Sequence, residues 1–231
     1  MATSMSVLAT WTIVPPFVRG DGSLQTGCIA VDQWTGEIYT AEKYNIISIK
    51  PSDAPSISCS IEAKVVINPQ RDTTFGLAIC QQTQTLYTAS CDTIIAYSLR
   101  SRGVKSRFQL TDRSARFRSH VYGVYEGDLF FSTSGGRTLM KVKINNNGSL
   151  NENEMATIHS GFKAIRGVAF DNGNCFIADK STNEITVIRL FDLITLKPIK
   201  LPSNASPNGI AFVKNVLAVS DDENNCVYFL A

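Results

Sequence analysis

The sequence contains few histidines, no closely spaced cysteines and no long hydrophobic run. A Ser-His-Asp triad would have to use His120 or His159, the only two histidines, and the G-x-S-x-G motif of many hydrolases does not occur. No apolar run approaches the ~18 residues that a membrane-spanning helix requires. The sequence therefore gives no support to a serine hydrolase of that kind or to a helical membrane protein.

The six cysteines form no CxxC pair and no Cys/His cluster: Cys28, Cys59, Cys80, Cys91, Cys175 and Cys226. This spacing disfavours zinc sites and redox dithiols, and we expect reduced, buried thiols. The N-terminal segment 1–18 lacks the basic start of a signal peptide and meets Pro15 and Pro16 after a short apolar run. We therefore expect a cytoplasmic protein, although the glycosylation sequon at Asn147 speaks against it.

Five similar segments follow one another along the sequence, each with three short apolar runs separated by polar turns. They span residues 28–49, 76–99, 123–144, 167–190 and 209–230. Their first runs recur at intervals of 48, 47, 44 and 42 residues, measured between Ala30, Ala78, Tyr125, Ala169 and Ala211. The runs are rich in Ile, Val, Tyr and Phe and are bounded by Asp, Asn, Gly, Ser and Thr, which is typical of β-strands. A strand repeat of this length predicts a β-propeller.

A fourth strand fits after each of the first four segments, in the stretches 58–67, 104–110, 155–160 and 194–201. The fifth segment is followed only by Ala231, so we expect its fourth strand to come from residues 6–14. There Val7, Ala9, Trp11 and Ile13 alternate onto one side, as in a half-buried strand. Pairing of this N-terminal strand in the last blade would close the ring and remove exposed edges.

We therefore predict an all-β, five-bladed β-propeller of four-stranded antiparallel blades, closed by the N-terminal strand. It forms a single domain over residues 1–231. The blades are expected at approximately 22–68, 69–112, 113–160, 161–202 and 203–231 plus 6–14.

The fourth segment, "GVAFDNGNCFIADKSTNEITVI", starts with glycine, has a second strand that ends in Ala-Asp and finishes with an I-x-V-I strand. In this pattern it resembles the NHL and YVTN repeats of β-propellers. The resemblance covers nearly the whole sequence and is weakest in the third segment, where Tyr125 and Glu126 replace small and apolar residues. It implies the architecture, whereas the function stays open because propellers include lectins, hydrolases, scaffolds and nucleic-acid binders.

In a propeller the first strand of each blade lines the central channel, and the residues before it reach one mouth of that channel. We predict a ligand-binding mouth formed by Gln25, Thr73, Phe75, His120, Tyr122, Arg166 and Asn208. Aromatic, amide, hydroxyl and cationic groups in one place suit a polar ligand or a peptide better than a metal ion. The same groups would also satisfy channel waters and backbone carbonyls.

The segment "SPNGIAF", residues 206–212, resembles the segment that carries a metal-binding Asn in gluconolactonase-like and paraoxonase-like propellers. The resemblance implies that Asn208 holds a Ca²⁺ or Zn²⁺ ion that polarises a lactone or ester carbonyl. Only this ligand carries over, because the matching positions are Gly27, Phe75, Tyr122 and Arg166, and those enzymes normally have six blades. We therefore expect no metal or cofactor, and a turn role explains Asn208 equally. A metal-dependent lactonase or esterase is the alternative.

Glycoside hydrolysis would need two carboxylates that face each other across the channel. The sequence does not bring its candidates together: Glu42, Glu126, Asp179 and Asp221. Asp32, Asp171 and Asp179 stand where strands end, which indicates turn-forming residues. The polar stretch 145–154, "NNNGSLNENE", predicts a surface loop between the third and fourth strands of its blade.

Charge is balanced overall, with 22 Lys+Arg against 20 Asp+Glu, yet basic residues concentrate between positions 100 and 118. We name these residues the basic flank: Arg100, Arg102, Lys105, Arg107, Arg113, Arg116 and Arg118. Phe108 and Phe117 are interleaved with them, a combination that suits RNA, as some NHL-type propellers bind it. An acidic protein or an anionic lipid surface matches the charges equally well, and so does a solvated edge strand.

The sequence as a whole favours a non-enzymatic binding or scaffold propeller, which recognises a protein or other macromolecule through the channel mouth and the basic flank. Two alternatives remain open at this point. One is a hydrolase with its site in the channel, and the other is an RNA-binding module of the NHL type.

Overall fold

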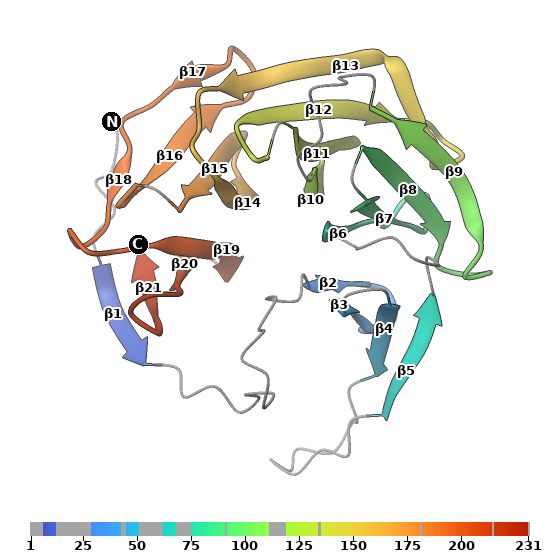
Figure 1. Ribbon diagram of the computed structural model, residues 1–231, viewed down its shortest axis with the longest axis horizontal. Helices are drawn as coiled ribbons and strands as arrows, with labels where there is room; N and C mark the ends of the chain where they lie inside the picture. The colour runs from blue at the N-terminus through green and yellow to red at the C-terminus, as the bar shows by residue number, and fades with distance from the viewer. Residues whose placement is uncertain are drawn as a thin grey trace. The chain divides into compact units, whose positions relative to one another are not determined.

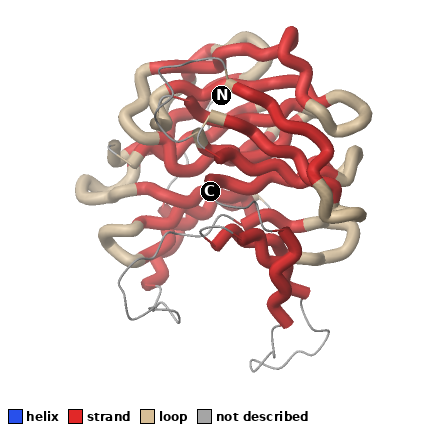
Figure 2. Tube along the Cα trace, turned by 45° about the vertical axis from the view of Figure 1, so that its right-hand side comes forward, coloured by secondary structure: helices blue, strands red, loops and turns tan. Residues whose placement is uncertain are grey.

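The computed structural model of the protein describes residues 7–12, 29–42, 45–50, 62–67, 75–90, 92–110, 119–133, 135–180, 182–213 and 215–230. These residues form the strands β1 to β21, joined by turns and loops, and none of them is helical (Figure 2). Within them, accordingly, no helix is long and apolar enough to cross a membrane. The predicted all-β class is confirmed.

One compact unit consists of the described residues of Arg19–Gly135 and Met140–Ala156. Two of its antiparallel sheets have the strand orders β2-β3-β4-β5 and β6-β7-β8-β9, so the strands of each sheet follow one another in sequence (Figure 1). The first comprises β2 (Ile29–Val31), β3 (Ile38–Glu42), β4 (Asn45–Lys50) and β5 (Glu62–Ile67). The second comprises β6 (Phe75–Cys80), β7 (Thr85–Ser90), β8 (Thr93–Ser98) and β9 (Val104–Gln109).

A third sheet of the order β10-β11-β12-β13 belongs mainly to the same unit. Its strands are β10 (His120–Tyr125), β11 (Asp128–Thr133), β12 (Thr138–Ile144) and β13 (Leu150–Ser160).

The other compact unit consists of the described residues of Met1–Val18, Gly136–Leu139 and Thr157–Ala231. One of its sheets contains β14 (Ile165–Asp171), β15 (Asn174–Asp179), β16 (Glu184–Arg189), β17 (Ile194–Thr195) and β18 (Ile199–Lys200). The other contains β19 (Pro207–Val213), β20 (Val216–Asp221), β21 (Cys226–Leu230) and β1 (Val7–Thr12), in the order β1-β21-β20-β19.

Strand β1 pairs antiparallel with β21, with Val7 opposite Leu230 and Thr12 opposite Cys226. The other edge of β21 pairs with β20. Residues from the start of the sequence therefore supply the outer strand of a sheet whose other strands lie more than 190 residues further along.

The outer position of the β14–β18 sheet is filled by two short strands, which corrects the predicted single strand over 194–201. Strand β17 pairs with the end of β16, and β18 pairs with its start. Between them, Leu196 donates its N–H to the carbonyl oxygen of Val187 at 2.8 Å. Pro198 follows and has no N–H to donate, so the ladder is interrupted there.

The predicted surface loop over 145–154 is too long, because β13 begins at Leu150. The turn before it is closed by the N–H of Gly148, which donates to the carbonyl oxygen of Asn145 at 2.8 Å. The carbonyl oxygen of Gly148 accepts a buried hydrogen bond of 2.9 Å from the hydroxyl of Tyr87 on β7. Polarity misled the prediction, since an outer strand pairs through its backbone while its side chains face solvent.

The first strands of four sheets each contain a β-bulge near their start. The register shifts between Phe75 and Leu77, Val121 and Gly123, Ile165 and Gly167, and Pro207 and Ile210. A bulge leaves a residue out of the hydrogen-bonded ladder and turns its side chain away from the regular alternation. The residues left out are Gly76, Tyr122, Arg166 and Asn208 with Gly209.

At Gly76 the backbones of β6 and β10 approach each other closely. Its φ is +76°, and a Cβ added there would lie 1.9 Å from the carbonyl oxygen of Val121. Gly167 plays the same part in the other unit, where an added Cβ would lie 2.6 Å from the carbonyl oxygen of Asn208 on β19. The glycine that leads the sequence repeat thus permits contact between neighbouring first strands.

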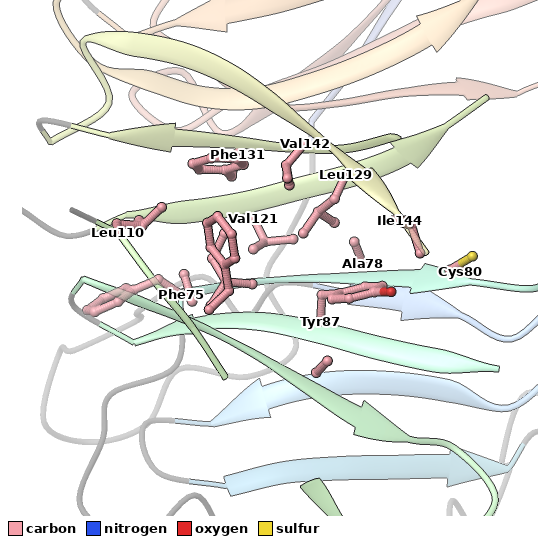
Figure 3. Packing of buried hydrophobic residues seen from close by; sticks show 14 residues of the cluster. Phe75, Ala78, Cys80, Tyr87, Leu110, Val121, Leu129, Phe131, Val142 and Ile144 are labelled. Atoms are coloured by element: carbon pink, nitrogen blue, oxygen red, sulfur yellow. The ribbon is translucent and has the colours of Figure 1, made fainter. Parts of the chain in front are cut away.

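Buried apolar side chains fill the space between adjacent sheets within each unit. Phe75, Tyr87, Leu129, Phe131 and Val142 belong to the cluster between the β6–β9 and β10–β13 sheets (Figure 3). Other clusters contain Tyr39, Ile46, Leu86 and Ile95 in the same unit, and Phe176, Ile185, Leu217, Val219 and Tyr228 in the other. Each fully buried side chain of this size contributes about 1.5–3 kcal/mol through removal of apolar surface from water.

The close approach at Gly76 predicts that Gly76→Ala destabilises the protein far more than Gly36→Ala. Gly36 also has a positive φ, +70°, but an added Cβ there meets nothing within 4 Å. The strained φ alone costs about 1–3 kcal/mol, whereas Gly76→Ala also displaces β10. Urea unfolding followed by circular dichroism measures both losses, and equal losses would contradict the close approach.

Candidate binding site

Three predicted mouth residues come together at the starts of β6 and β10. The ring centroids of Phe75 and His120 are 5.2 Å apart, and those of His120 and Tyr122 are 6.2 Å apart with planes 14° from parallel. The Tyr122 hydroxyl donates to Oγ of Ser132 at 3.0 Å. Phe75 is buried in the core, while His120 and Tyr122 are half-buried. Phe75 therefore offers a ligand little surface, whereas His120 and Tyr122 are partly accessible.

Two further mouth residues, Arg166 and Asn208, occupy bulges on β14 and β19 of the other unit. Arg166 is exposed, and Nδ2 of the half-buried Asn208 donates to Oδ1 of Asp222 at 2.9 Å. Gln25 and Thr73 lie outside the described residues. Tyr122, Arg166 and Asn208 occupy equivalent positions of the repeat. Each of them is left out of the hydrogen-bonded ladder by the bulge in its strand.

A hollow of about 620 Å³ runs along the first strands of the unit that contains β2, β6 and β10. We call it the inner-strand hollow. Its walls are residues 29–31 of β2, 77–80 of β6 and 122–124 of β10. Its polar lining is made by Gln33, Gln81, Gln82, Glu126, Lys143 and Asn146. It combines the edges of extended strands with amide side chains.

Of the predicted mouth residues that the structure describes, Tyr122 alone lines this hollow. The polar lining was missed because most of it follows the first strands, at Gln33, Gln81, Gln82 and Glu126, whereas the prediction used the residues that precede them. A signal was present, since a polar turn follows the first run of every repeat. The sequence alone did not show at which end of the first strands a hollow would form.

The hollow offers apolar contacts as well as amides. Ile29 is 68% exposed and Val31 is 46% exposed, which is unusual for β-branched residues in a strand. Nε2 of Gln81 donates to the carbonyl oxygen of Val31 at 3.1 Å and fixes one amide against β2. Nζ of Lys143 pairs with Oδ1 of Asp128 at 3.2 Å. Such a lining can hold an extended polypeptide that has both apolar and amide groups.

Two acids considered for catalysis instead hold the backbone. Oδ2 and Oδ1 of Asp179 accept the N–H groups of Lys163 and Ala164, each at 2.9 Å. Oδ2 of Asp221 accepts the N–H of Ser206 at 3.2 Å and the hydroxyl of Tyr228 at 2.9 Å. Each acid ends a second strand and ties down the segment before the first strand of its own sheet. Neither is therefore free to act as a general acid or base.

Burial raises the pKa of Asp221, but its hydrogen bonds from Asn224, Tyr228 and Ser206 outweigh that effect. The net result is a pKa below the ordinary value for a carboxyl group. The carboxylate form is therefore favoured by the folded state.

The turn role predicted for Asp32 is confirmed. Its carboxylate accepts the N–H of Trp34 at 3.0 Å and the hydroxyl of Thr35 at 2.9 Å. His159 on β13 packs edge-on against Phe162, with ring centroids 5.2 Å apart. Among the described residues, no group of three or more His, Cys, Asp or Glu side chains could hold a metal ion.

The basic flank is only partly available to a partner. Arg102 donates to both carboxylate oxygens of Glu37, at 3.2 and 3.0 Å, and to the Tyr39 hydroxyl, with its guanidinium 5.1 Å from the Tyr39 ring centroid. Nζ of Lys105 donates to the carbonyl oxygen of Thr83 at 2.9 Å. Arg113, Arg116 and Arg118 lie outside the described residues. Arg100 and Arg107 remain exposed.

Hydrogen bonding keeps the Arg102–Glu37 pair charged. Burial raises the pKa of Glu37, yet hydrogen bonds from Ser48, Tyr39 and Arg102 bring it below its ordinary value. Burial together with the hydrogen bond to Glu37 raises the pKa of Tyr39 to about 12. The pair is therefore ionised at neutral pH.

Three cysteines are buried and unbridged: Cys80, Cys175 and Cys226. Burial raises the pKa of the Cys175 thiol, which disfavours the reactive thiolate. The expected burial is confirmed for these three, whereas Cys28, Cys59 and Cys91 lie outside the described residues.

The Asp221 contacts predict that Asp221→Asn lowers the free energy of unfolding by about 1–3 kcal/mol, because an amide cannot satisfy all the donors around it. In the unaltered protein the stabilisation by Asp221 is fully present above the pKa of the unfolded carboxyl group, about 3.9. It is lost as the pH falls from there through the lower folded-state pKa. Urea unfolding at pH 7 and below pH 4 measures both effects. The exposed Glu223→Gln is the matched control, and an equal loss in it would contradict the assignment.

No protein-family model and no curated protein matches the sequence. Solved structures do match: an auxiliary nutrient binding protein from Bacteroides thetaiotaomicron is 9% identical with a TM-score of 0.73, over 90% of this chain and 60% of that one. The Cps50 (Swd1) β-propeller domain of Myceliophteria thermophila is 9% identical with a TM-score of 0.62, over 87% and 68%. The glutaminyl cyclase of Myxococcus xanthus is 11% identical with a TM-score of 0.59, over 98% and 95%.

The sequence spans about three fifths of the length of the nutrient binding protein. At these identities the similarity concerns the fold alone, and the NHL or YVTN family remains a prediction. These neighbours include a binding protein and an enzyme, so they leave the choice between binding and catalysis to the residues of this protein. The similarity to these structures supports a β-propeller fold for the sheets described above.

Proposed function

We propose that the protein is a non-enzymatic binding module, a closed five-bladed propeller that holds an extended segment of a protein partner in the inner-strand hollow. The observation that carries this proposal is the lining of that hollow by strand edges, amides and two exposed β-branched side chains. The single domain, its closure by β1 and its cytoplasmic location are parts of the same proposal.

An extended polypeptide fits the hollow in size and chemistry. Ligand-binding pockets commonly measure about 300–1,000 Å³, and the hollow has about 620 Å³. Among the described residues, β2, β6 and β10 each stand at the end of their sheet order, so one edge of each lacks a neighbour within its own sheet. Amides such as Gln82 and Asn146 can bond a peptide backbone, while Ile29 and Val31 contact apolar side chains.

A protein partner is favoured over RNA by the state of the basic flank. Arg102 is neutralised by Glu37, and Lys105 uses two of its three donors on Thr83 and Thr85, so two of the four described cations are at least partly engaged within the molecule. A row of free cations with stacking aromatics is what single-stranded nucleic acid requires. The predicted mouth residues His120 and Tyr122, which belong to the same unit as the inner-strand hollow, would contribute further contacts to a protein.

Binding is favoured over hydrolysis because the candidate catalytic groups are engaged in hydrogen bonds within the protein. Asp179 and Asp221 accept backbone N–H groups, and the amide nitrogen of Asn208 is bonded to Asp222. A metal-dependent lactonase or esterase would need further ligands beside Asn208, and no acid or His cluster of three occurs in the described residues. Hydrolysis is therefore kept as an outcome of the tests below.

Peptides selected against the full protein from a displayed random library are expected to bind in the hollow. Ile29→Ser should weaken their binding about tenfold, because one well-buried apolar side chain is worth about 1.4 kcal/mol or more. Val104→Ser is the matched control, since Val104 is a 50% exposed β-branched residue of β9 outside the hollow. Fluorescence anisotropy measures both affinities. Failure to select any peptide, or an equal loss in Val104→Ser, would contradict the proposal.

Turnover of a panel of lactones and esters in the presence of Ca²⁺ or Zn²⁺ is expected to stay at the rate without protein. Asn208→Ala should leave that rate unchanged, because Asn208 lies in a bulge of β19, which corrects its predicted turn role, and its amide is bonded to Asp222. A colorimetric ester assay and a pH-stat lactone assay measure the rates. Metal-dependent turnover that disappears in Asn208→Ala would establish the hydrolase alternative instead.

A further inference from the structure

A second hollow, of about 510 Å³, lies between the β2–β5 and β6–β9 sheets at the level of their connecting turns. We call it the flank hollow, because three residues of the basic flank line it: Arg100, Arg102 and Lys105. The opposite wall carries Asp32 and Glu37, and the remaining lining includes hydroxyl groups of Thr35, Thr83 and Ser98. It is separate from the inner-strand hollow, with which it shares no lining residue.

The two acids of the flank hollow are already satisfied by the protein. Glu37 accepts hydrogen bonds from Tyr39 at 2.7 Å, from Ser48 and from Arg102 at 3.0 and 3.2 Å. Asp32 is buried and caps its own turn through Trp34 and Thr35. Neither carboxylate therefore seeks a cation from outside.

Two cations of the flank hollow, in contrast, have no carboxylate partner among the described residues. Nζ of Lys105 donates to two neutral oxygens, the carbonyl of Thr83 at 2.9 Å and Oγ1 of Thr85 at 2.8 Å. An ammonium group has three protons, so one donor remains. Arg100 is exposed and takes part in no ion pair within the described ranges. Both cations border the same hollow.

Neighbouring residues hold the side chain of Lys105 in place. A Cβ added at Gly148, in the turn before β13, would lie 3.0 Å from its Nζ and 2.3 Å from Oγ1 of Thr85. The ammonium group of the exposed Lys105 thus lies beside a neighbouring turn and donates to two oxygens of the protein. A donor that is already positioned loses little conformational entropy when it binds an anion.

The charges that line the hollow determine which anion fits. Three cations and two carboxylates leave one net positive charge, since Arg102 and Glu37 cancel and Asp32 offsets one further cation. A singly charged carboxylate matches this balance better than a phosphate monoester, because Asp32 repels the phosphate, which carries about −1.5 to −2 charges, more strongly than it repels a single negative charge. Hydroxyl donors such as that of Ser98 suit either oxyanion, so the net charge of the lining residues decides which anion fits.

We infer that the flank hollow binds one carboxylate group of a protein partner between Arg100 and Lys105. Arg100 reaches the carboxylate from the rim with its guanidinium fork, and Lys105 donates its remaining proton. The carboxylate belongs either to an acidic residue of the partner or to its C-terminus, and both sources present the same group. The inference does not depend on the peptide proposed for the inner-strand hollow.

Titrations of the full protein with small carboxylates, followed by two-dimensional amide NMR, test this assignment. N-acetylglutamic acid α-amide presents the carboxylate of an acidic residue, N-acetylglycine presents a C-terminal one, and N-acetylglutamine α-amide is the neutral control. We expect saturable shifts of the amide signals of Ser98, Arg100 and Lys105 with one or both carboxylates and none with the neutral control. The tighter of the two carboxylates identifies the source.

Matched variants separate the site from general surface charge. Arg100→Gln and Lys105→Gln should each weaken carboxylate binding about fivefold or more, while Arg107→Gln, an exposed cation of the same segment that does not line the hollow, should leave it unchanged. Circular dichroism checks that each variant is folded, and Arg100→Gln removes no ion pair among the described residues. Equal losses in all three variants, absence of saturable shifts, or tighter binding of monomethyl phosphate would each overturn the inference.

Discussion

Close contact between the first strands of neighbouring sheets is the constraint on which the rest of this structure depends. Gly76 lets β6 approach the backbone of β10, and Gly167 lets β14 approach β19. A Cβ at either position would overlap a backbone carbonyl oxygen. With the first strands in contact, the second and third strands of adjacent sheets face each other, and Tyr87, Leu129 and Phe131 fill the space between them. The bulges that accompany these contacts also decide which residues leave the ladder.

The same architecture explains why residues that look chemically active serve structural purposes. The segment that leads into a first strand must be fixed, because that strand starts in contact with the first strand of the next sheet. Asp179 and Asp221 fix this segment by accepting hydrogen bonds from its backbone N–H groups. Likewise Arg102, from a markedly basic segment, bridges two sheets through Glu37 and Tyr39. With these groups engaged, the amide-lined inner-strand hollow and the flank hollow are the features best suited to a partner. Under the proposals made above, both hollows recognise a protein partner.

The outcome for particular elements shows where local patterns sufficed and where they did not. The strands of β14 to β16 and β19 to β21 follow directly from apolar runs between turn residues, and they occur at the predicted segments. The outer strands were harder, because β13 starts in a polar stretch and Pro198 divides the strand expected over 194–201. Outer strands bury few side chains, so their sequences show little hydrophobic periodicity. Where such a strand begins and ends is decided by backbone pairing with the third strand of its sheet.

The sequence by itself determined the all-β class, the repeat, the leading glycines and the turn role of Asp32, because each rests on residues that are close together in the sequence. Tertiary structure alone decided which charges cancel and which surfaces are hollow. Arg102 and Glu37 are 65 positions apart, and the inner-strand hollow draws on three sheets. No local pattern encodes such pairings. They arise only when separate sheets pack against one another, since the energy of a charge or an amide depends on what finally surrounds it.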